Sequence, residues 1–149
     1  MRSVVQKVKN SKVFVDDQKV GEINKGLLVF LGVEKGDEKA DFEYIRDKII
    51  HLRIFEDDRQ KMNRSVLDVE GEVLVVSQFT LSGDVRKGRR PSFIAAADPE
   101  EARIFYDRMI EDLKSYGLKV EQGVFQAHME VALINDGPVT ILLDSKKKF

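Results

Sequence analysis

Two uninterrupted apolar runs dominate the pattern of hydrophobic and polar positions along the chain: residues 27–33 (LLVFLGV) and residues 73–76 (VLVV). A continuous run of this kind predicts a strand that is buried on both faces of a sheet. The second run passes directly into residues 77–80 (SQFT), which bring hydroxyl and amide groups to the end of a buried strand. Because a buried polar group without a partner costs about 1–3 kcal/mol, these groups either form a site or leave the core in a turn. The local pattern leaves both interpretations open.

Two segments with apolar residues at intervals of three and four predict amphipathic helices. The first runs from residue 37 or 38 to residue 51, with Asp37 as its N-cap. The second spans residues 98–117 and begins with Asp-Pro-Glu-Glu. In this start the aspartate caps, the proline fits the first helical position, and the second glutamate completes a capping-box-like pair. The expected buried stripes are Phe42, Ile45, Ile49 and Leu52 in the first helix, and Ala102, Phe105, Met109, Leu113 and Tyr116 in the second.

Shorter stretches of alternating or apolar character predict the remaining strands. Because two helices alternate with too few strands to form βαβ units, the order predicts an α+β fold. We expect antiparallel strands in a barrel-like or two-sheet core, with the two helices packed outside it. The length suits a single domain, residues 1–149. The short strands are predicted at residues 3–8, 12–15, 20–23, 53–55, 119–121, 129–134 and 139–143, separated by turns at 16–19, 24–26, 56–58 and 135–138, with an irregular stretch at 62–71.

The composition narrows the possible chemistry. The chain has no cysteine, which excludes disulfides, thiolate metal ligands and a cysteine nucleophile, and which fits a cytoplasmic protein. The first ten residues lack the apolar segment of a signal peptide, and no apolar run is long enough for a membrane span. His51 and His128 are the only histidines, and no Walker or Rossmann glycine-rich motif is present. We therefore expect no metal, no cofactor and no membrane partner.

Local rather than global charge would recruit an anionic partner, because 25 lysine and arginine residues stand against 26 aspartate and glutamate residues. The one basic segment is residues 82–91 (SGDVRKGRRP), which its glycines and proline mark as a loop. Its Arg86, Lys87, Arg89 and Arg90 are candidate contacts for the phosphates of a nucleic acid, although a solvated loop is the ordinary explanation of such a charge run. The mobile basic tail, with residues 146–148 (KKK), could add to this patch.

Two motifs become specific only in combination: SQFTL at residues 77–81 and NDGPVT at residues 135–140. Together with residues 26–37 (GLLVFLGVEKGD) and 89–93 (RRPSF), they resemble the D-aminoacyl-tRNA deacylases of the bacterial and eukaryotic type. The resemblance covers nearly the whole chain. One departure is Lys7, where many members are expected to carry an arginine that supports the Gly-Pro segment. Lysine keeps the charge but lacks the planar fork, so this supporting role is in doubt.

The resemblance implies a homodimer with its site at the subunit interface. The Gly137–Pro138 peptide bond would be cis and would enter the partner's pocket beside residues 77–80. The substrate would be the ester that joins an amino acid to the 3′-terminal adenosine of tRNA. D-amino acids and glycine, including glycine mischarged on tRNA(Ala), would be released, and L-amino acids would be refused. The Gly-Pro carbonyl groups would accept hydrogen bonds from the α-ammonium group, and a rigid wall would exclude an L side chain more strongly than pocket affinity does.

Residues Ser77, Gln78, Phe79 and Thr80 are the catalytic candidates for this hydrolysis. A Thr80 nucleophile would need an adjacent base, and the motif carries no histidine, lysine or carboxylate. We therefore expect backbone N–H groups around Phe79 and Thr80 to form the oxyanion hole, Ser77 and Gln78 to orient the terminal adenosine, and the substrate's ribose hydroxyl to activate water. Met129 either lines the pocket or packs in the core. The alternative functions are a non-catalytic RNA-binding barrel and a conventional esterase with Thr80 as nucleophile.

Overall fold

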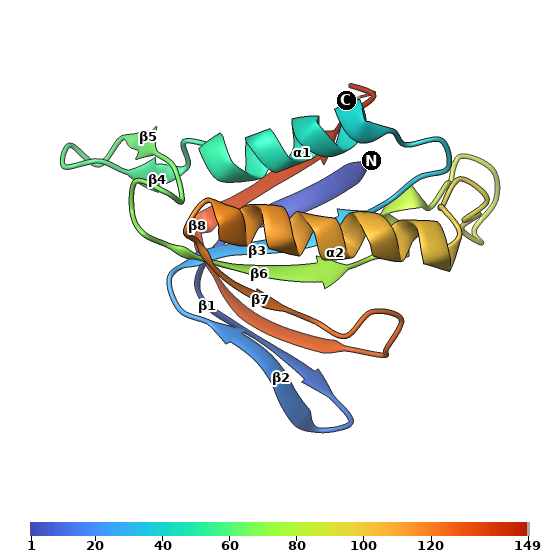
Figure 1. Ribbon diagram of the computed structural model, residues 1–149, viewed down its shortest axis with the longest axis horizontal. Helices are drawn as coiled ribbons and strands as arrows, with labels where there is room; N and C mark the ends of the chain where they lie inside the picture. The colour runs from blue at the N-terminus through green and yellow to red at the C-terminus, as the bar shows by residue number, and fades with distance from the viewer. Residues whose placement is uncertain (149) are drawn as a thin grey trace.

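The computed structural model describes residues 1–148 and consists of one curved sheet, two helices that pack side by side on one of its faces, and a small separate hairpin (Figure 1). In chain order the elements are β1 (Arg2–Val15), β2 (Gln18–Ile23), β3 (Gly26–Gly32), α1 (Lys39–His51), β4 (Phe55–Glu56), β5 (Met62–Arg64), β6 (Glu72–Ser77), the short 3-10 helix η1 (Phe79–Ser82), α2 (Pro99–Ser115), β7 (Lys119–Gln122) and β8 (Glu130–Asp144).

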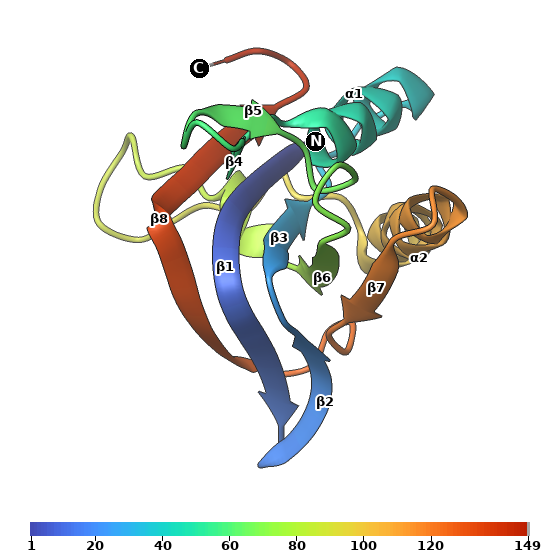
Figure 2. The ribbon, with the colours of Figure 1, turned by 90° about the vertical axis from the view of Figure 1, so that its left-hand side faces the viewer.

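The sheet has the strand order β2-β1-β3-β6-β7, and β8 pairs with β1. The first half of β1 pairs with β3 and its second half with β2, while β8 runs antiparallel along both halves. Figure 2 shows the resulting strong curvature, with β8, β1 and β2 bending away from the helices. The α+β class and the barrel-like core are therefore confirmed.

The prediction of an antiparallel sheet is wrong for three strands. β3 and β6 pair in parallel, and so do β6 and β7. Each pair is joined by a crossover that contains a helix, α1 in the first case and α2 in the second. The signal was present, because continuous apolar runs are typical of parallel strands covered on both faces. The carboxyl ends of β3, β6 and β7 consequently lie at one edge of the sheet, which is where open parallel sheets bind ligands.

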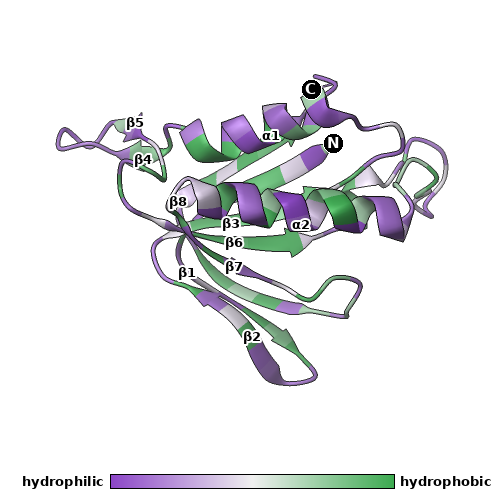
Figure 3. Ribbon diagram, viewed as in Figure 1, coloured by the Kyte–Doolittle hydropathy of each residue, from purple (hydrophilic) through white to green (hydrophobic). Residues whose placement is uncertain are grey.

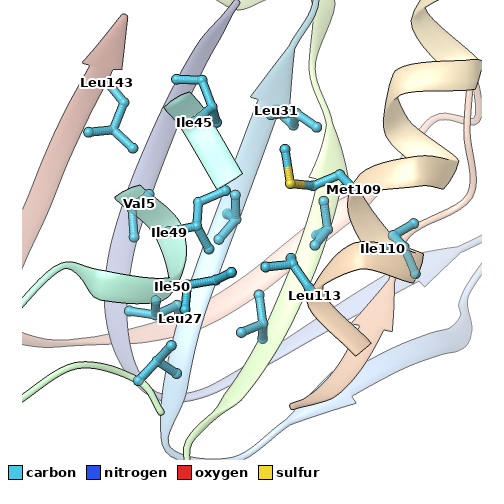
Figure 4. Close-up of a cluster of buried hydrophobic side chains, with 14 of the residues drawn as sticks. Val5, Leu27, Leu31, Ile45, Ile49, Ile50, Met109, Ile110, Leu113 and Leu143 are labelled. Atoms are coloured by element: carbon cyan, nitrogen blue, oxygen red, sulfur yellow. The ribbon is translucent and has the colours of Figure 1, made fainter. Parts of the chain in front are cut away.

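The core explains why residues 73–76 are all apolar. Val73 and Val75 belong to the cluster beneath the helices, whereas Leu74 and Val76 belong to a second cluster on the concave side of the sheet. Hydrophobic and hydrophilic residues are interspersed along both helices (Figure 3), and mostly apolar residues of each helix are buried. Fully burying one such side chain stabilises a fold by about 1.5–3 kcal/mol. The helix-side cluster in Figure 4 includes Val5, Leu27, Leu31 and Leu143 of the sheet, Ile45, Ile49 and Ile50 of α1, and Met109, Ile110 and Leu113 of α2.

The predicted helix stripes are largely confirmed. Phe42, Ile45 and Ile49 are buried in α1, as are Met109 and Leu113 in α2, while Leu52, Ala102 and Phe105 are partly buried against the same cluster. The prediction that Tyr116 is buried is wrong, because this residue is 44% exposed. It follows the last residue of α2 as the C-cap, so its direction no longer follows the helical period. Tyr106 and Ile110 are buried instead.

The predicted caps differ in detail from those observed. The N-cap of α1 is Glu38, which forms a capping box with Asp41. The Asp37 carboxylate instead accepts hydrogen bonds from the amino group of Met1 at 2.5 Å and from the backbone N–H of Glu34 at 2.7 Å. Asp98 is the N-cap of α2 and Pro99 is its first residue, as predicted, but the Asp98 side chain forms no capping hydrogen bond.

Several strand boundaries are corrected by the structure. β1 continues through residues 9–11, where a break was predicted, and β8 continues through residues 135–138, where a sharp turn was predicted. Both strands continue through these positions because β1 and β8 pair with each other along nearly their whole length. The predicted strand at residues 53–55 is shifted to Phe55–Glu56, and part of the stretch predicted to be irregular forms its partner β5.

The prediction of a mobile basic tail is wrong as far as residue 148, where the tail is held against acidic side chains; Phe149 lies outside the described residues. Lys146 Nζ lies 2.7 Å from Asp41 Oδ2, and Lys148 Nζ lies 3.8 Å from Glu34 Oε2. The Lys146 hydrogen bond lowers the pKa of Asp41 despite partial desolvation of this carboxyl. Within residues 1–148, no helix is both long and apolar enough to cross a membrane.

Candidate active site

A pocket of about 470 Å³ opens at the shared carboxyl edge of the parallel strands. Leu31 and Val33 reach it from the end of β3, and Ser77 reaches it from the end of β6. The start of α2 and the loop between β7 and β8 form the rest of its wall. Four polar or catalytic candidates predicted from the sequence therefore meet in one cavity: Ser77, Gln78, Phe79 and Thr80 all line it.

The backbone changes direction at Gln78, which explains how the end of β6 becomes a pocket wall. Gln78 is extended (φ −146°, ψ 90°), and its N–H donates to the carbonyl oxygen of Leu31 at 2.8 Å, while Phe79 begins η1. The first residues of a helix have no intrahelical acceptor for their N–H groups. Among the hydrogen bonds of residues 1–148, none uses the N–H of Phe79 or Thr80. Two backbone donors are thus available beside the pocket.

The Thr80 hydroxyl has an amide neighbour rather than a base. Gln78 Nε2 donates to Thr80 Oγ1 at 3.0 Å. In the described part of the chain, no histidine, lysine or carboxylate forms a hydrogen bond with Thr80 Oγ1. This arrangement orients the hydroxyl without providing a group that could remove its proton.

The pocket mouth carries an aromatic pair. Phe79 is 60% exposed and packs edge-on against Phe93, with the ring centroids 5.1 Å apart. Phe93 belongs to the segment RRPSF, so the loop that follows η1 returns to the pocket. Val85 and Ile94 in the same loop are also exposed, at 62% and 82%. Exposed large apolar side chains beside a pocket are candidates for an interaction site.

Sequence reasoning missed Tyr106 as a wall residue. The hydroxyl group of Tyr106 is buried and donates to the carbonyl oxygen of Val75 at 2.9 Å, which fixes α2 against the end of β6. Burial raises the pKa of Tyr106, so the phenol stays neutral. The tyrosine one position after the predicted stripe residue Phe105 was the available signal.

Met129 lines the pocket and also packs against the second core cluster, so both interpretations of this residue hold. It precedes β8, and its side chain lies directly over Gly123. A Cβ atom on Gly123 would come within 2.5 Å of Met129 Sδ. The absence of a side chain at Gly123 leaves room for the Met129 thioether in its present position. The neighbouring Phe125, Gln126 and Ala127 also line the pocket and were not predicted.

Residues 136–139 of β8 leave the ladder with β1. The pairs on either side are Gln6–Thr140 and Val8–Asn135, so only Lys7 lies opposite this segment. The Gly137–Pro138 peptide bond within it is cis, as the resemblance implies. Both residues are exposed, and neither lines the pocket of its own chain.

Asn135 holds the two ends of this segment together. Its Oδ1 accepts a hydrogen bond from the N–H of Val139 at 2.9 Å, and its Nδ2 donates to Thr140 Oγ1 at 3.0 Å. Gly137 has a φ of 134°, and a Cβ atom there would lie 2.6 Å from Val139 Cγ2. Only glycine combines this conformation with the close approach. The motif NDGPVT thus describes a braced protrusion rather than an ordinary turn.

Lys7 braces the same segment from β1. Its side chain is 1% exposed, and its Nζ lies 3.5 Å from Asp136 Oδ2 and 2.6 Å from Glu56 Oε1. Lys7 therefore reaches the Gly-Pro segment as a point charge rather than as a planar fork.

The basic loop lies outside the pocket. Its two ends are joined by backbone hydrogen bonds between Asp84 and Ser92. Arg86 is bound to Asp84 and lowers the pKa of that carboxyl, so this arginine is already neutralised. Lys87, Arg89 and Arg90 are exposed and form no ion pair within residues 1–148. They are the cations of this loop that remain available to an anionic partner.

No group of three or more histidine, aspartate or glutamate side chains among residues 1–148 is arranged to hold a metal ion. The reactive groups present around the pocket are hydroxyl, amide and backbone N–H groups. Such groups can bind and polarise a carbonyl oxygen, which is the main requirement for ester hydrolysis.

Comparison with known proteins identifies the family. The family model for D-Tyr-tRNA(Tyr) deacylase matches residues 4–144. D-aminoacyl-tRNA deacylases of Thermosipho africanus and Halothermothrix orenii are 58% and 61% identical to this chain over 149 residues, with both chains covered completely. A solved structure described as c-Myc DNA Unwinding Element Binding Protein has a TM-score of 0.91 at 40% identity and covers 97% of this chain and 98% of its own. A probable eukaryotic D-amino acid tRNA deacylase shares the fold, with a TM-score of 0.80 at 18% identity over 95% and 97% of the two chains. The chain belongs to the D-Tyr-tRNA(Tyr) deacylase family.

Proposed function

We propose that this protein hydrolyses the ester bond of D-aminoacyl-tRNA and of glycyl-tRNA, including glycine mischarged on tRNA(Ala), and leaves L-aminoacyl-tRNA intact. The observation that carries the proposal is the position of the complete SQFT segment, residues 77–80, along one pocket wall at the carboxyl edge of the sheet. Relatives that match this chain over its whole length carry the name D-aminoacyl-tRNA deacylase.

The acting unit is a homodimer in which Gly137 and Pro138 of one subunit enter the pocket of the other. Two features support this arrangement. The Gly-Pro segment is exposed and braced, yet it lies outside the pocket of its own chain. Apolar side chains are exposed at the pocket mouth and along β8, where Ile134 and Leu142 are 52% and 58% exposed. A second copy would cover both surfaces at once.

Discrimination of handedness follows from a rigid backbone in the pocket. With the α-ammonium group and the ester of the substrate fixed, the two remaining substituents of the α-carbon point in different directions for the two enantiomers. The Gly137–Pro138 backbone occupies the direction that an L side chain would need. A D side chain points outward, and glycine has no side chain to exclude. Steric exclusion of this kind exceeds the about 1–3 kcal/mol that one methylene contributes to pocket affinity.

Hydrolysis proceeds through a tetrahedral oxyanion, which the N–H groups of Phe79 and Thr80 stabilise. These are the two donors without a partner at the start of η1. Ser77 and Gln78 orient the terminal adenosine, and the ribose hydroxyl of the substrate activates the attacking water. The protein therefore provides positioning and hydrogen-bond donors, and the substrate provides the base.

Turnover of D-tyrosyl-tRNA by the purified protein tests the function directly. We expect release of free D-tyrosine, and no comparable release from L-tyrosyl-tRNA. An RNA-binding protein without activity would retain the tRNA but leave both esters intact. A conventional esterase would hydrolyse small esters in the absence of tRNA, and either outcome would replace the present proposal.

Replacing Thr80 by alanine separates the oxyanion mechanism from the nucleophile mechanism. Thr80→Ala keeps the backbone N–H and removes the hydroxyl group that Gln78 contacts, together with the γ-methyl group. We expect the single-turnover rate with D-tyrosyl-tRNA to fall by less than about tenfold, since a single hydrogen bond contributes roughly 0.5–1.5 kcal/mol. Near-total loss of the rate, together with a trapped acyl-enzyme, would instead identify Thr80 as the nucleophile.

Replacing Arg89 and Arg90 by alanine tests the basic loop as a tRNA contact. Both cations are exposed and lie outside the pocket, so we expect KM for D-aminoacyl-tRNA to rise and kcat to change little. The slope of log KM against log salt concentration should decrease by about 0.7–0.9 for each phosphate contact that is lost. Arg53→Ala provides a control, because that arginine is bound to Asn63 in the hairpin region. An unchanged salt dependence would show that Arg89 and Arg90 do not contact tRNA phosphates and that the loop is only a solvated surface.

A further inference from the structure

The β4–β5 hairpin is linked to the segment that carries Gly137 and Pro138 through one buried ammonium group. Lys7 lies between Glu56 of the hairpin and Asp136 of β8, with Nζ at 2.6 Å and 3.5 Å from the two carboxylates. A buried cation is costly unless anions compensate its charge. Because Lys7 is 1% exposed, its position depends on these two carboxylates together.

The hairpin is itself fixed to the core, so that it can serve as the reference point. Phe55 is fully buried in the helix-side cluster, and its ring centroid lies 5.9 Å from Lys7 Nζ. The next residue, Glu56, pairs with Met62 of β5. The hydrogen bond from Lys7 lowers the pKa of Glu56, so this residue stays a carboxylate at neutral pH. A rigid line of contacts therefore runs from the core through Phe55 and Glu56 to Lys7.

We infer that Glu56 is a positioning residue, which fixes Lys7 and through it Asp136, and thereby sets where the Gly137–Pro138 segment stands. The inference rests on the proposed function, in which this segment discriminates between D- and L-aminoacyl substrates. Glu56 lies outside the pocket of its own chain. Its influence on selectivity is therefore indirect.

The lysine at position 7 makes this contribution necessary. An arginine presents a planar fork whose geometry is set by its own covalent structure, whereas a lysine is a point charge on a flexible stem. The direction of the Lys7 side chain is consequently set by its partners. Without Glu56, Lys7 would retain only the longer contact with Asp136, and the distance between Asp136 and β1 would no longer be fixed.

Glu56→Gln tests the inference, with Asp58→Asn as a matched control. Asp58 is a carboxylate of the same hairpin, but it pairs with Arg64 at 3.0 Å and does not contact Lys7. We expect Glu56→Gln to lower the ratio of kcat/KM for D-tyrosyl-tRNA to that for L-tyrosyl-tRNA by about tenfold, within the range of coupling between contacting groups. The urea midpoint should fall while the protein stays folded, because Lys7 would keep only the longer contact with Asp136 to compensate its buried charge. Asp58→Asn should leave both quantities unchanged.

A second readout separates this inference from the function on which it rests. In the free protein, the NMR amide signals of Gly137 and Val139 should shift in Glu56→Gln and not in Asp58→Asn. In a Lys7→Met background, Glu56→Gln should have no further effect on either readout, because Glu56 acts through Lys7. Unmoved amide signals, an additive effect in the Lys7→Met background, or loss of folding in Glu56→Gln would each overturn the inference. An inactive wild-type protein whose amide signals move as expected would refute the function alone.

Discussion

Replacing Gly137 by alanine is expected to lower kcat/KM for D-aminoacyl-tRNA by about 10- to 100-fold, because residues forced into glycine-only conformations cost about 1–3 kcal/mol. The φ of Gly137 is 134°, and an added Cβ atom would lie 2.6 Å from Val139 Cγ2 and 2.9 Å from Val139 N. The segment can relieve these contacts only by moving, and it would then no longer present its backbone at the position that the substrate requires. The ratio of rates for D- and L-tyrosyl-tRNA should fall as well.

Gly36→Ala is the matched control for this experiment. Gly36 also has a positive φ, 74°, but nothing lies within 4 Å of the position that its Cβ atom would occupy. This variant incurs the conformational cost without displacing the Gly-Pro segment, so kcat/KM should stay within about threefold of the wild-type value. If the two alanine variants have the same activity, the Gly137–Pro138 segment has no role in the reaction.

The single-turnover rate of Phe79→Pro is expected to be about 10²–10³-fold lower than that of Phe79→Ala. This is the typical effect of losing one oxyanion-hole donor. Both variants lack the aromatic ring, so their difference reports the backbone N–H alone. Proline is tolerated at the first position of a helix, and Gln78 already has the extended conformation that a residue before proline requires. Each variant should therefore retain the fold, which circular dichroism and urea unfolding can verify.

Equal rates for Phe79→Pro and Phe79→Ala would exclude the Phe79 N–H from the oxyanion hole. In that case the donor set would have to be sought elsewhere on the pocket wall. A difference of the expected size, together with a small effect of Thr80→Ala, would place the stabilising groups on the backbone. Side-chain substitutions alone cannot make this distinction, because they leave every N–H group in place.

The sequence determines the elements of this fold more clearly than their pairing. The continuous apolar runs at residues 27–33 and 73–76 correctly indicate strands covered on both faces, and the helical spacing of Phe42, Ile45 and Ile49 identifies a buried face. Such runs are compatible with parallel pairing, but they do not show which strands pair, because that depends on which strands a crossover helix brings together. The position of the pocket follows from that pairing, and the sequence could not provide it.

The Gly-Pro segment illustrates a second limit of local reasoning. Asn-Asp-Gly-Pro is a strong turn signal, yet β8 continues through it because β1 pairs with the strand on both sides of the interruption. Tertiary pairing thus overrides the turn propensity of residues 135–138. The braces formed by Asn135 and Lys7 likewise join residues that no spacing rule connects. A role for position 7 was implied by the resemblance, whereas the Asn135 brace is visible only in the folded chain.

Subunit complementation tests the central claim most directly, namely that the pocket of one subunit is completed by the Gly-Pro segment of the other. Phe79→Pro and Gly137→Ala proteins, each with little activity alone, are mixed, unfolded and refolded together, and D-tyrosyl-tRNA hydrolysis is measured. A hybrid dimer would contain one site with an intact pocket and an intact segment, so random mixing should restore roughly a quarter of the wild-type activity, given two equivalent sites in a twofold dimer. Activity that stays at the average of the two separate variants would contradict the claim, because each site would then be built from a single chain.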